Sequence, residues 1–254
     1  MSNILSINNL SIHVGHRELI KNTSFDINEG DAILLSGPNG VGKSSILKSI
    51  LRLDSDGKQI NGAIQHRTFG DILQIGNSEL QRFRSSIAYV QQRDEYAEMG
   101  NIQVKDIISE SFEAHSGKSL SFAEVNDLID EWIPRRPDNR RIFDAKSKPA
   151  KFSGGEQRLL SVLSVVSTRS NSDLLIVDEP LNNLDFANAR NISNLINKVI
   201  KNNPSMGLIM VSHCRIFPFI NREISLSPEG VSEETRHYEC HSCFGEPDSQ
   251  GYYI

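Results

Sequence analysis

The chain has 254 residues and a formal net charge of −5, and its composition is 38% hydrophobic and 23% charged. This length allows one large or two small domains with a substantial core. The negative charge argues against a general nucleic-acid binder, no run of about 18 apolar residues could span a membrane, and three cysteines are too few for a disulfide framework. The N-terminal residues carry neither a basic leader nor a continuous apolar stretch, so we expect a chain of the reducing cytoplasm that is not secreted.

The first part of the chain is predicted to be β-structure. Residues 3–28 alternate apolar and polar in several places, and a Glu29-Gly30 turn follows, which predicts an antiparallel sheet. Ala32 to Leu35 is a short continuous apolar run, typical of a fully buried parallel strand. From Ile46 to Leu51 apolar residues recur at helical spacing, so the segment between these two runs should join a strand to a helix.

The joining segment matches the phosphate-binding pattern G-x-x-x-x-G-K-[ST]. Its glycines let successive N–H groups point at one anion, and the helix that follows adds its positive dipole end. Lys43 can reach the outer phosphates, and the Ser44 hydroxyl can ligate Mg²⁺. A Gly-rich turn before an ordinary helix is the alternative. The predicted phosphate-binding residues are Gly37, Pro38, Asn39, Gly40, Val41, Gly42, Lys43, Ser44 and Ser45.

The middle of the chain changes character. Residues 54–62 are predicted to form a polar turn region and residues 63–76 more strand and loop, whereas Ser86 to Val90 is a buried strand that leads into two glutamines. Residues 93–151 show helical apolar spacing and then three prolines, which indicates a helical insert in an α/β core. Its last part is basic, which a solvated face explains more simply than contact with nucleic acid or another acidic partner. The basic residues are Arg135, Arg136, Arg140, Arg141, Lys146, Lys148 and Lys151.

The next helix is predicted to begin at a capping box, with Ser153 at the cap and Glu156 three residues later. Apolar residues at helical spacing follow it. Gly154 and Gly155 occupy the first turn, where they leave the N–H groups open to a large ligand. The segment is therefore a candidate second anion site, and a well-capped helix without a ligand is the alternative.

Two further apolar runs, residues 174–177 and 208–211, flank an amphipathic helix and predict a right-handed parallel crossover. Open α/β sheets gather their ligands at the carboxyl ends of such strands. Asp178 and Glu179 follow the first run, and His213 follows the second. Asp178 can hold Mg²⁺ directly or through water, Glu179 can orient or deprotonate a water molecule, and His213 can sense a terminal phosphate.

Together these motifs resemble the nucleotide-binding domain of ATP-binding cassette (ABC) proteins, from Ser6 to about Gly230. The resemblance implies an α/β fold of the ABC ATPase type, with a parallel P-loop NTPase core, an N-terminal antiparallel β-subdomain and a helical subdomain inserted at about residues 93–160. The domain that it implies spans residues 1–230 and leaves a C-terminal tail, 231–254. The motifs in chain order are GPNGVGKSS (Gly37–Ser45, Walker A), AYVQQ (Ala88–Gln92, Q-loop), FSGGEQ (Phe152–Gln157, signature), LLIVDEP (Leu174–Pro180, Walker B), LNNLD (Leu181–Asp185, D-loop) and MVSHC (Met210–Cys214, H-switch).

The resemblance also implies a Mg²⁺-dependent ATPase that works as a head-to-tail dimer. ATP held by the Walker A loop of one copy would be covered by the signature motif of the other. The implied catalytic residues are Glu179, His213 and Gln92; the implied Mg²⁺ ligands are Ser44, Gln92 and Asp178; and the residues implied to meet the nucleotide or the partner across the dimer are Ser153, Gly154, Gly155, Glu156 and Asp185.

Two positions near the nucleotide depart from the family pattern. Val14 stands where an aromatic residue usually stacks on adenine, and His13 and His16 are candidates to replace it. Gln91 stands where a proline usually precedes the Q-loop glutamine, so Gln91 and Gln92 both stay candidates for that role.

The cysteines lie in the last fifth of the chain. Cys214 occupies the position at which an Asp often follows the switch histidine. In the tail, Cys240 and Cys243 with His237 and His241 could suggest zinc, but four ligands within so few residues are cramped for one tetrahedral site. We interpret these cysteines as unpaired surface thiols.

The sequence thus predicts the ATPase subunit of an ABC transporter, peripheral on the cytoplasmic face of the cell membrane. Its expected partners are a second nucleotide-binding domain and a separate transmembrane permease subunit that docks near residues 92–132; nucleic acid is not expected. The alternative is a soluble ABC ATPase that acts on nucleic acid, the ribosome or a protein assembly. A nucleotide switch that does not hydrolyse ATP is disfavoured by the presence of Glu179.

Overall fold

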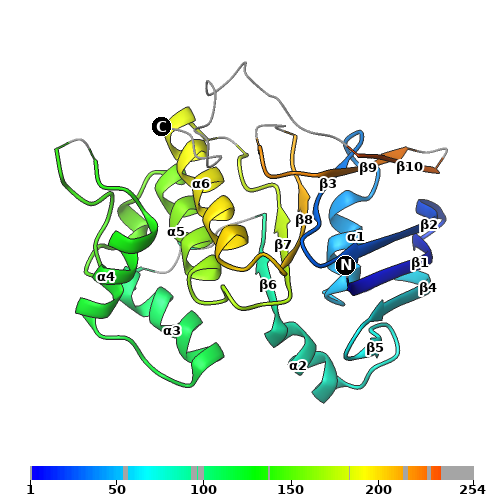
Figure 1. The fold of residues 1–254 in the computed structure, drawn as a ribbon, viewed down its shortest axis with the longest axis horizontal. Coiled ribbons are helices and arrows are strands. Elements are labelled where there is room, and N and C mark those ends of the chain that lie inside the picture. Colours follow the sequence, from blue (N-terminus) through cyan, green and yellow to red (C-terminus); the bar gives the residue numbers. More distant parts are fainter. Residues whose placement is uncertain are drawn as a thin grey trace.

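A computed structural model describes residues 2–53, 57–92, 96, 100–136, 138–182, 184–213, 217–227 and 230–235 of the chain. Two sheets lie beside each other, and most of the helices form a layer on one side of the larger sheet (Figure 1). None of the helices described there is long and apolar enough to cross a membrane.

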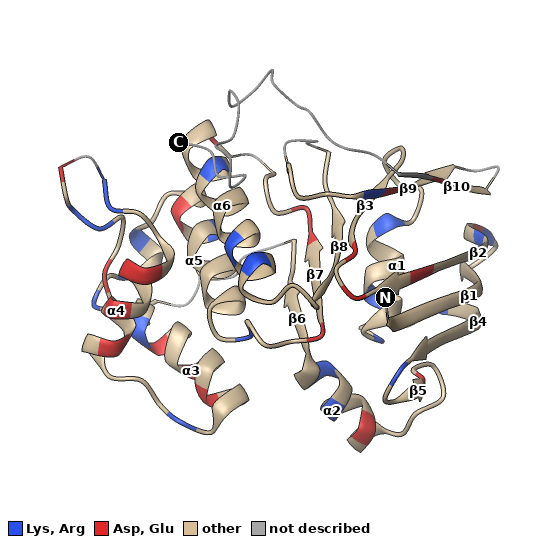
Figure 2. Cartoon of the chain, viewed as in Figure 1, with Lys and Arg blue, Asp and Glu red and all other residues tan. Residues whose placement is uncertain are grey.

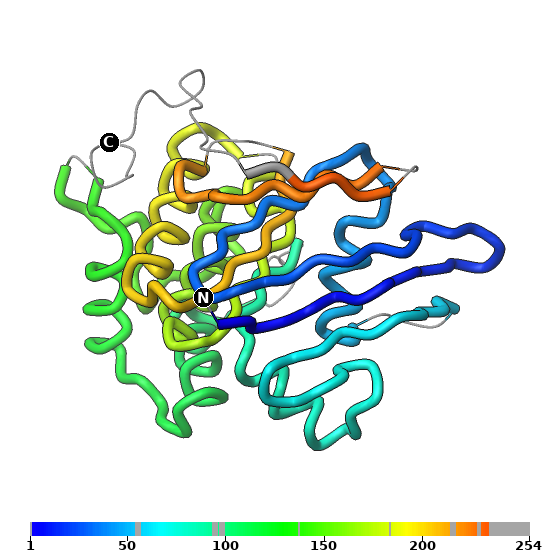
Figure 3. Tube along the Cα trace, turned by 45° about the vertical axis from the view of Figure 1, so that its right-hand side comes forward, coloured from blue at the N-terminus to red at the C-terminus, as the bar shows by residue number. Residues whose placement is uncertain are grey.

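The smaller sheet is antiparallel and has the strand order β2-β1-β4-β5. Its first two strands form a long hairpin that extends away from the helices (Figure 3). The predicted N-terminal antiparallel sheet is therefore confirmed. Its strands are β1 (Asn3–Val14), β2 (Arg17–Asn28), β4 (Lys58–His66) and β5 (Gly70–Asp71).

The larger sheet has the strand order β10-β9-β3-β8-β7-β6. All neighbouring strands from β9 to β6 are parallel. β10, which begins at residue 230, the predicted end of the domain, pairs antiparallel with β9. The sheet consists of β3 (Ala32–Ser36), β6 (Ile87–Val90), β7 (Leu174–Asp178), β8 (Gly207–Val211), β9 (Arg222–Ser227) and β10 (Gly230–Thr235).

The continuous apolar runs of the sequence form central strands that are buried on both faces. In β3, Ile33 and Leu35 pack into one core, which the β1–β4 sheet also enters, while Ala32 and Leu34 pack into a second core among the helices. Successive side chains of a strand point to opposite faces, so a strand with a core on each side cannot alternate apolar and polar residues.

The helices lie on both sides of the larger sheet, with α5 and α6 between the sheet and the outer pair, α3 and α4 (Figure 1). The predicted helical insert is confirmed by this outer pair. The helices are α1 (Lys43–Ile50), α2 (Asn77–Ser86), α3 (Val104–Ser116), α4 (Phe122–Trp132), α5 (Gly154–Val166) and α6 (Phe186–Asn202), with a 3₁₀ turn at Pro149–Lys151.

In the middle of the chain, one prediction is wrong and one helix has no prediction. The polar turn region predicted at residues 54–62 is wrong from Lys58 onward, where β4 begins. Most of β4 is exposed and its sequence is mostly polar, so the sequence resembles that of a turn. Helix α2 was not expected after residue 76, because only Leu80 and Phe83 of its residues are buried, which is too few to produce a clear apolar period.

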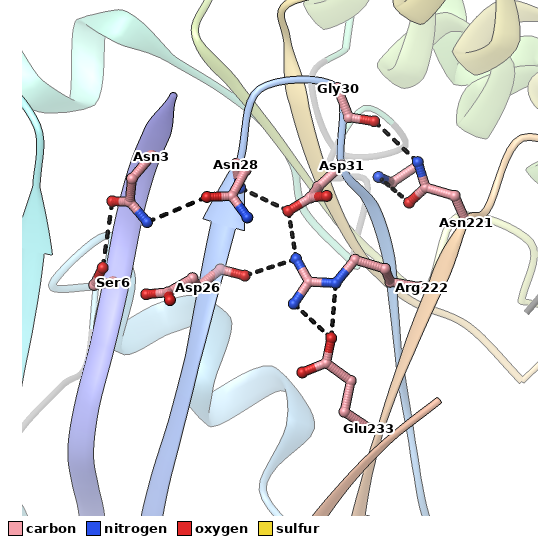
Figure 4. A network of polar contacts seen from close by, with 10 residues as sticks. Asn3, Ser6, Asp26, Asn28, Gly30, Asp31, Asn221, Arg222 and Glu233 are labelled. Carbon is pink, nitrogen blue, oxygen red and sulfur yellow. Dashed lines mark hydrogen bonds and ion pairs between the residues drawn. The ribbon is translucent and has the colours of Figure 1, made fainter. Parts of the chain in front are cut away.

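A polar network holds the first residues of β3 to the neighbouring strands (Figure 4). Asn221 accepts from the N–H of Ala32 at 2.9 Å and donates to the carbonyl of Gly30 at 3.0 Å. Arg222 donates to Asp31, whose side chain is 8% exposed, and its Nε donates to Glu233 at 2.8 Å. The network fixes the start of the strand that leads to the predicted phosphate loop.

Arg222→Met should destabilise the fold by about 2–4 kcal/mol, because it leaves the buried carboxylate of Asp31 without its cationic partner. Urea denaturation of both proteins measures the difference. Arg140→Met is the matched control, since the Arg140 side chain is 78% exposed and its pairing with Asp138 should contribute nothing measurable. Equal loss in the two variants would contradict the role assigned to the network.

Candidate active site

The segment between β3 and α1 is a turn built on three glycines with positive φ. Gly37, Gly40 and Gly42 have φ values of 131°, 76° and 106°. A Cβ on Gly37 would lie 2.3 Å from the carbonyl oxygen of Leu226, and one on Gly42 would lie 2.7 Å from Cδ1 of Ile20, so side chains are excluded at both. The start of α1 has no side-chain cap and no acidic residue in its first turn, which is the arrangement that favours an anion.

Lys43, the first residue of α1, turns back over this loop. Its Nζ donates to the carbonyl oxygens of Gly37 at 2.8 Å and Pro38 at 3.0 Å. Lys43 is only 6% exposed, and burial lowers its pKa, an effect that the charges of Glu179 and Asp178 oppose. Carbonyl dipoles compensate a buried ammonium less well than phosphate oxygens would.

Ser44 and Asp178 meet beneath the loop. Ser44 Oγ donates to Asp178 Oδ1 at 2.9 Å. Asp178 is 1% exposed, and its other oxygen, Oδ2, is buried without a hydrogen-bond partner in the described part of the chain. Burial raises the pKa of Asp178, and the hydrogen bond from Ser44 opposes this. Mg²⁺ prefers hydroxyl and carboxylate oxygens of this kind, so the two residues fit one metal ion that phosphates and water would complete.

Glu179 lies where three strand ends converge. Its backbone has a φ of 46°, a left-handed conformation unusual for a residue with a side chain, and its N–H donates to the carbonyl of Val211 at 2.8 Å. Its carboxylate accepts from Gln92 Nε2 at 3.1 Å and from the amide of Asn182, and it lies 3.3 Å from His213 Nε2. Sites of function often hold such strained backbone.

This geometry separates the two Q-loop candidates. The side chain of Gln92 reaches Glu179, while Gln91 offers its backbone carbonyl to the buried guanidinium of Arg158. Gln92, Glu179 and His213 thus come together, and Ser44 and Asp178 form a neighbouring pair linked to them through the backbone of residues 178 and 179.

The signature residues lie at a different place. Ser153 Oγ accepts from the N–H of Glu156 at 3.2 Å, and the Glu156 carboxylate accepts from the N–H of Ser153 at 3.0 Å, so the predicted capping box is present. Ser153, Glu156, Asp185 and Asn188 line one hollow of about 450 Å³. A Cβ on Gly155 would lie 2.3 Å from Asn188 Nδ2, so the start of α5 packs closely against the start of α6. Within one chain, no phosphate-loop residue lines this hollow.

A second hollow, of about 280 Å³, adjoins the phosphate loop. Arg17, Leu19 and Lys21 of β2 line it together with Asn39 and Val41 of the loop. Of the residues considered for adenine contact, Val14 is 41% exposed at the end of β1, and the imidazole of His13 lies 3.6 Å from Glu18. Cys214 and the tail residues His237, Cys240, His241 and Cys243 lie outside the described residues.

The four arginines of the basic stretch after α4 pair with acidic side chains, and the two colours lie together there in Figure 2. Asp130 accepts from Arg135 and Arg141 at 2.8 and 2.6 Å, and these bonds lower the pKa of Asp130 to about 2. Arg136 pairs with Glu156 at 3.1 Å. The pairing of these arginines agrees with the interpretation of this stretch as a solvated face.

Two residues of the site escaped the sequence analysis. Asn182 lies in the D-loop, where nothing in its residue type marks it as a partner of Glu179. Arg158 does leave a signal: it precedes Val162 and Val166 at intervals of four residues, on the inward stripe of α5. A charged residue on an apolar stripe indicates a buried, bonded group.

The fold and the group of polar side chains at the strand ends define a P-loop nucleotide-binding protein. The ABC transporter family model matches residues 20–182, so the chain belongs to the ABC transporter family. The ABC ATPase fold and the ABC-type ATPase class predicted from the sequence are thereby confirmed.

Relatives agree with this placement. The phosphate import ATP-binding protein PstB of Saccharolobus solfataricus is 26% identical over 215 residues, which cover 83% of this chain and 78% of that protein. The zinc import ATP-binding protein ZnuC of Rickettsia conorii is 29% identical over 211 residues, 83% of this chain and 76% of that protein. A dimeric structure of the ATP-binding cassette MJ0796 in a post-hydrolysis state, bound to ADP and Pi, has a TM-score of 0.72 at 20% identity and covers 92% of this chain and 100% of that chain.

Asp178→Asn should leave the protein without nucleotide about as stable as the wild type, because burial already disfavours the charged carboxylate that the change removes. The same change should abolish most of the stabilisation by Mg²⁺ with ATP, which we expect to raise the melting temperature of the wild type by several degrees. Thermal unfolding in EDTA and in Mg²⁺ with ATP measures both effects. Asp127→Asn, on the exposed face of α4, is the control. If Mg²⁺ with ATP raised the melting temperature of Asp178→Asn as much as that of the wild type, Asp178 would not hold the metal.

Proposed function

We propose that the chain binds ATP with Mg²⁺ and hydrolyses it as the energy-coupling subunit of an ABC transporter. The observation that carries the proposal is the pair of Ser44 and Asp178, with one buried carboxylate oxygen left over, directly before the carboxylate of Glu179. A place for a hard cation thus adjoins a group able to orient water.

Phosphate binding is assigned to the N–H groups of the glycine loop and to Lys43. With nucleotide present, Lys43 exchanges its carbonyl partners, Gly37 and Pro38, for the outer phosphates, and the amides of the loop surround the inner ones. Mg²⁺, held by Ser44 and Asp178 with Gln92 as a further ligand, supplies positive charge that neutralises the phosphates.

Hydrolysis is assigned to Glu179, Gln92 and His213. Glu179 accepts a proton from the attacking water, and Gln92, which already donates to that carboxylate, orients the water. His213, 3.3 Å from Glu179, reaches from the end of β8 toward the terminal phosphate. Asn182 completes the ring of donors around the carboxylate.

A second copy of the chain is proposed to complete the site. The hollow of Ser153, Glu156 and Asp185 has no phosphate-loop residue in its lining, so within one chain these residues do not act on the bound nucleotide. A head-to-tail partner places that hollow, with Gly154 and Gly155 at its helix start, over the nucleotide of the other copy. The dimeric state named for the cassette MJ0796 supports this arrangement.

A membrane partner is proposed at a groove between the core and the helical insert. A hollow of about 260 Å³ is lined by apolar side chains that include Leu51, Leu53 and Tyr89, and also by Arg84 and Arg169. Leu53 is 43% exposed. We assign it to a short helix of a separate permease subunit, which places the chain on the inner face of the cell membrane. The import proteins among its relatives favour an importer, and their different cargoes, phosphate and zinc, assign none to this chain.

Glu179→Gln should slow ATP hydrolysis by roughly 10²–10⁴-fold, the usual contribution of a general base, while ATP binding persists. The variant should therefore accumulate as an ATP-bound dimer. Steady-state ATPase assays and gel filtration with Mg²⁺ and ATP test both points.

Lys43→Ala should instead weaken ATP binding by about tenfold or more and form no ATP-bound dimer. Normal turnover by Glu179→Gln would refute the role given to this residue.

Leu53→Asp should lower the amount of permease that co-purifies with the chain from solubilised membranes, because it removes the exposed apolar side chain of the groove and puts a carboxylate beside Arg84 and Arg169. The fold should tolerate the change, since Leu53 is already 43% exposed. Lys43→Ala should keep the association, as its change lies at the phosphate loop. Recovery of equal amounts of a membrane protein with Leu53→Asp and with the wild type would place the docking surface elsewhere.

A further inference from the structure

Arg158 is a buried cation on the inner face of α5, and it is 4% exposed. Its Nε donates to the carbonyl of Pro180 at 3.1 Å, its Nη2 donates to the carbonyls of Asp178 at 3.1 Å and Glu179 at 3.2 Å, and its Nη1 donates to the carbonyl of Gln91. A buried guanidinium is costly unless its donors are satisfied. Here backbone oxygens of two separate segments satisfy them.

These carbonyls belong to the two strand ends that carry the proposed catalytic groups. Gln91 follows β6 and precedes Gln92, while Asp178 ends β7 and precedes Glu179. The left-handed backbone of Glu179 is strained for a residue with a Cβ. Its N–H is bonded to Val211 and its carbonyl to Arg158, so both flanking peptide groups are fixed in the geometry that aims the carboxylate.

The N-cap of the same helix is Ser153, five residues before Arg158. At a rise of 1.5 Å per residue, the backbone of Arg158 lies about 7–8 Å along the helix axis from this cap. In the dimer of the proposed function, on which this inference rests, that start faces the nucleotide of the partner copy. Helix α5 therefore connects the partner's nucleotide with the catalytic turn of its own chain.

We propose that Arg158 is a positioning residue through which α5 sets the place of Glu179. Arg158→Met keeps the length of the side chain and removes every donor, while Arg158→Lys keeps the charge but cannot reach all four carbonyls from one nitrogen. Arg52→Met is the matched control, because Arg52 also donates to backbone carbonyls, those of Ile72 and Ile75, away from the strand ends.

Turnover with saturating Mg²⁺ and ATP, and the ATP dissociation constant of each full-length variant, separate positioning from binding. Arg158→Met should lower kcat at least about 30-fold and change the dissociation constant less than threefold, with Arg158→Lys between it and the wild type. Arg52→Met should stay within twofold of the wild type in both. Circular dichroism establishes that each variant is folded.

Single-turnover assays in the Glu179→Gln background test whether Arg158 acts through Glu179. The double variant Arg158→Met/Glu179→Gln should be no more than twofold slower than Glu179→Gln alone, and it should still dimerise with Mg²⁺ and ATP. Multiplied losses, or loss of the dimer, would overturn the proposal.

The remaining outcomes also decide the matter. Wild-type kcat in Arg158→Met, or in Arg158→Lys should the Met variant not fold, would overturn the role of Arg158 and leave the proposed function standing. A wild-type chain that does not hydrolyse ATP would overturn the proposed function itself, and the inference with it.

Discussion

The hydrogen bond between Ser44 and Asp178 joins the two halves of the site. It connects the first turn of α1, which follows the glycine loop, to the end of β7, which leads into Glu179. Asp178 is buried, and its second oxygen has no hydrogen-bond partner among the described residues, so it is available to the Mg²⁺ of the proposed function. The position of Asp178 in turn depends on β7 lying next but one to β3 in the parallel sheet, with β8 between them. The order of the strands therefore sets the position of the phosphate loop relative to Asp178 and the metal site proposed there.

Around this hydrogen bond, polar groups are buried at positions where packing alone would favour apolar side chains. Lys43, Asp178 and Arg158 are all less than a tenth exposed, and Glu179 keeps a left-handed backbone. Each of these departs from what packing alone favours, and all of them lie at the carboxyl ends of β3, β6, β7 and β8 or on the helices that meet them. Such local conflicts are expected where function, and not folding, selects the residues.

Much of the molecule could be predicted because its signals are local. The runs at Ala32–Leu35, 174–177 and 208–211 have to be strands buried on both faces, and the glycine loop has to follow the first of them. Helix α2 could not be predicted because it buries only two side chains, and strand β4 could not be predicted because its sequence is mostly polar. The role of Arg158 depends on carbonyls 67 and about 20 residues away, and pairings at such separations leave no periodic pattern in a single sequence.

The shared apolar core of the helical layer constrains how the insert can move. Val104 and Ile108 of α3 and Val125 and Ile129 of α4 belong to the same cluster as the sheet side chain Leu34, with α5 between. Such continuous packing favours sliding of one helix along another over a free hinge, in steps small enough for side chains to keep their rotamers. A pull on the insert by the permease of the proposed function would thus be transmitted as shear along α5, the helix that carries both the signature motif and Arg158.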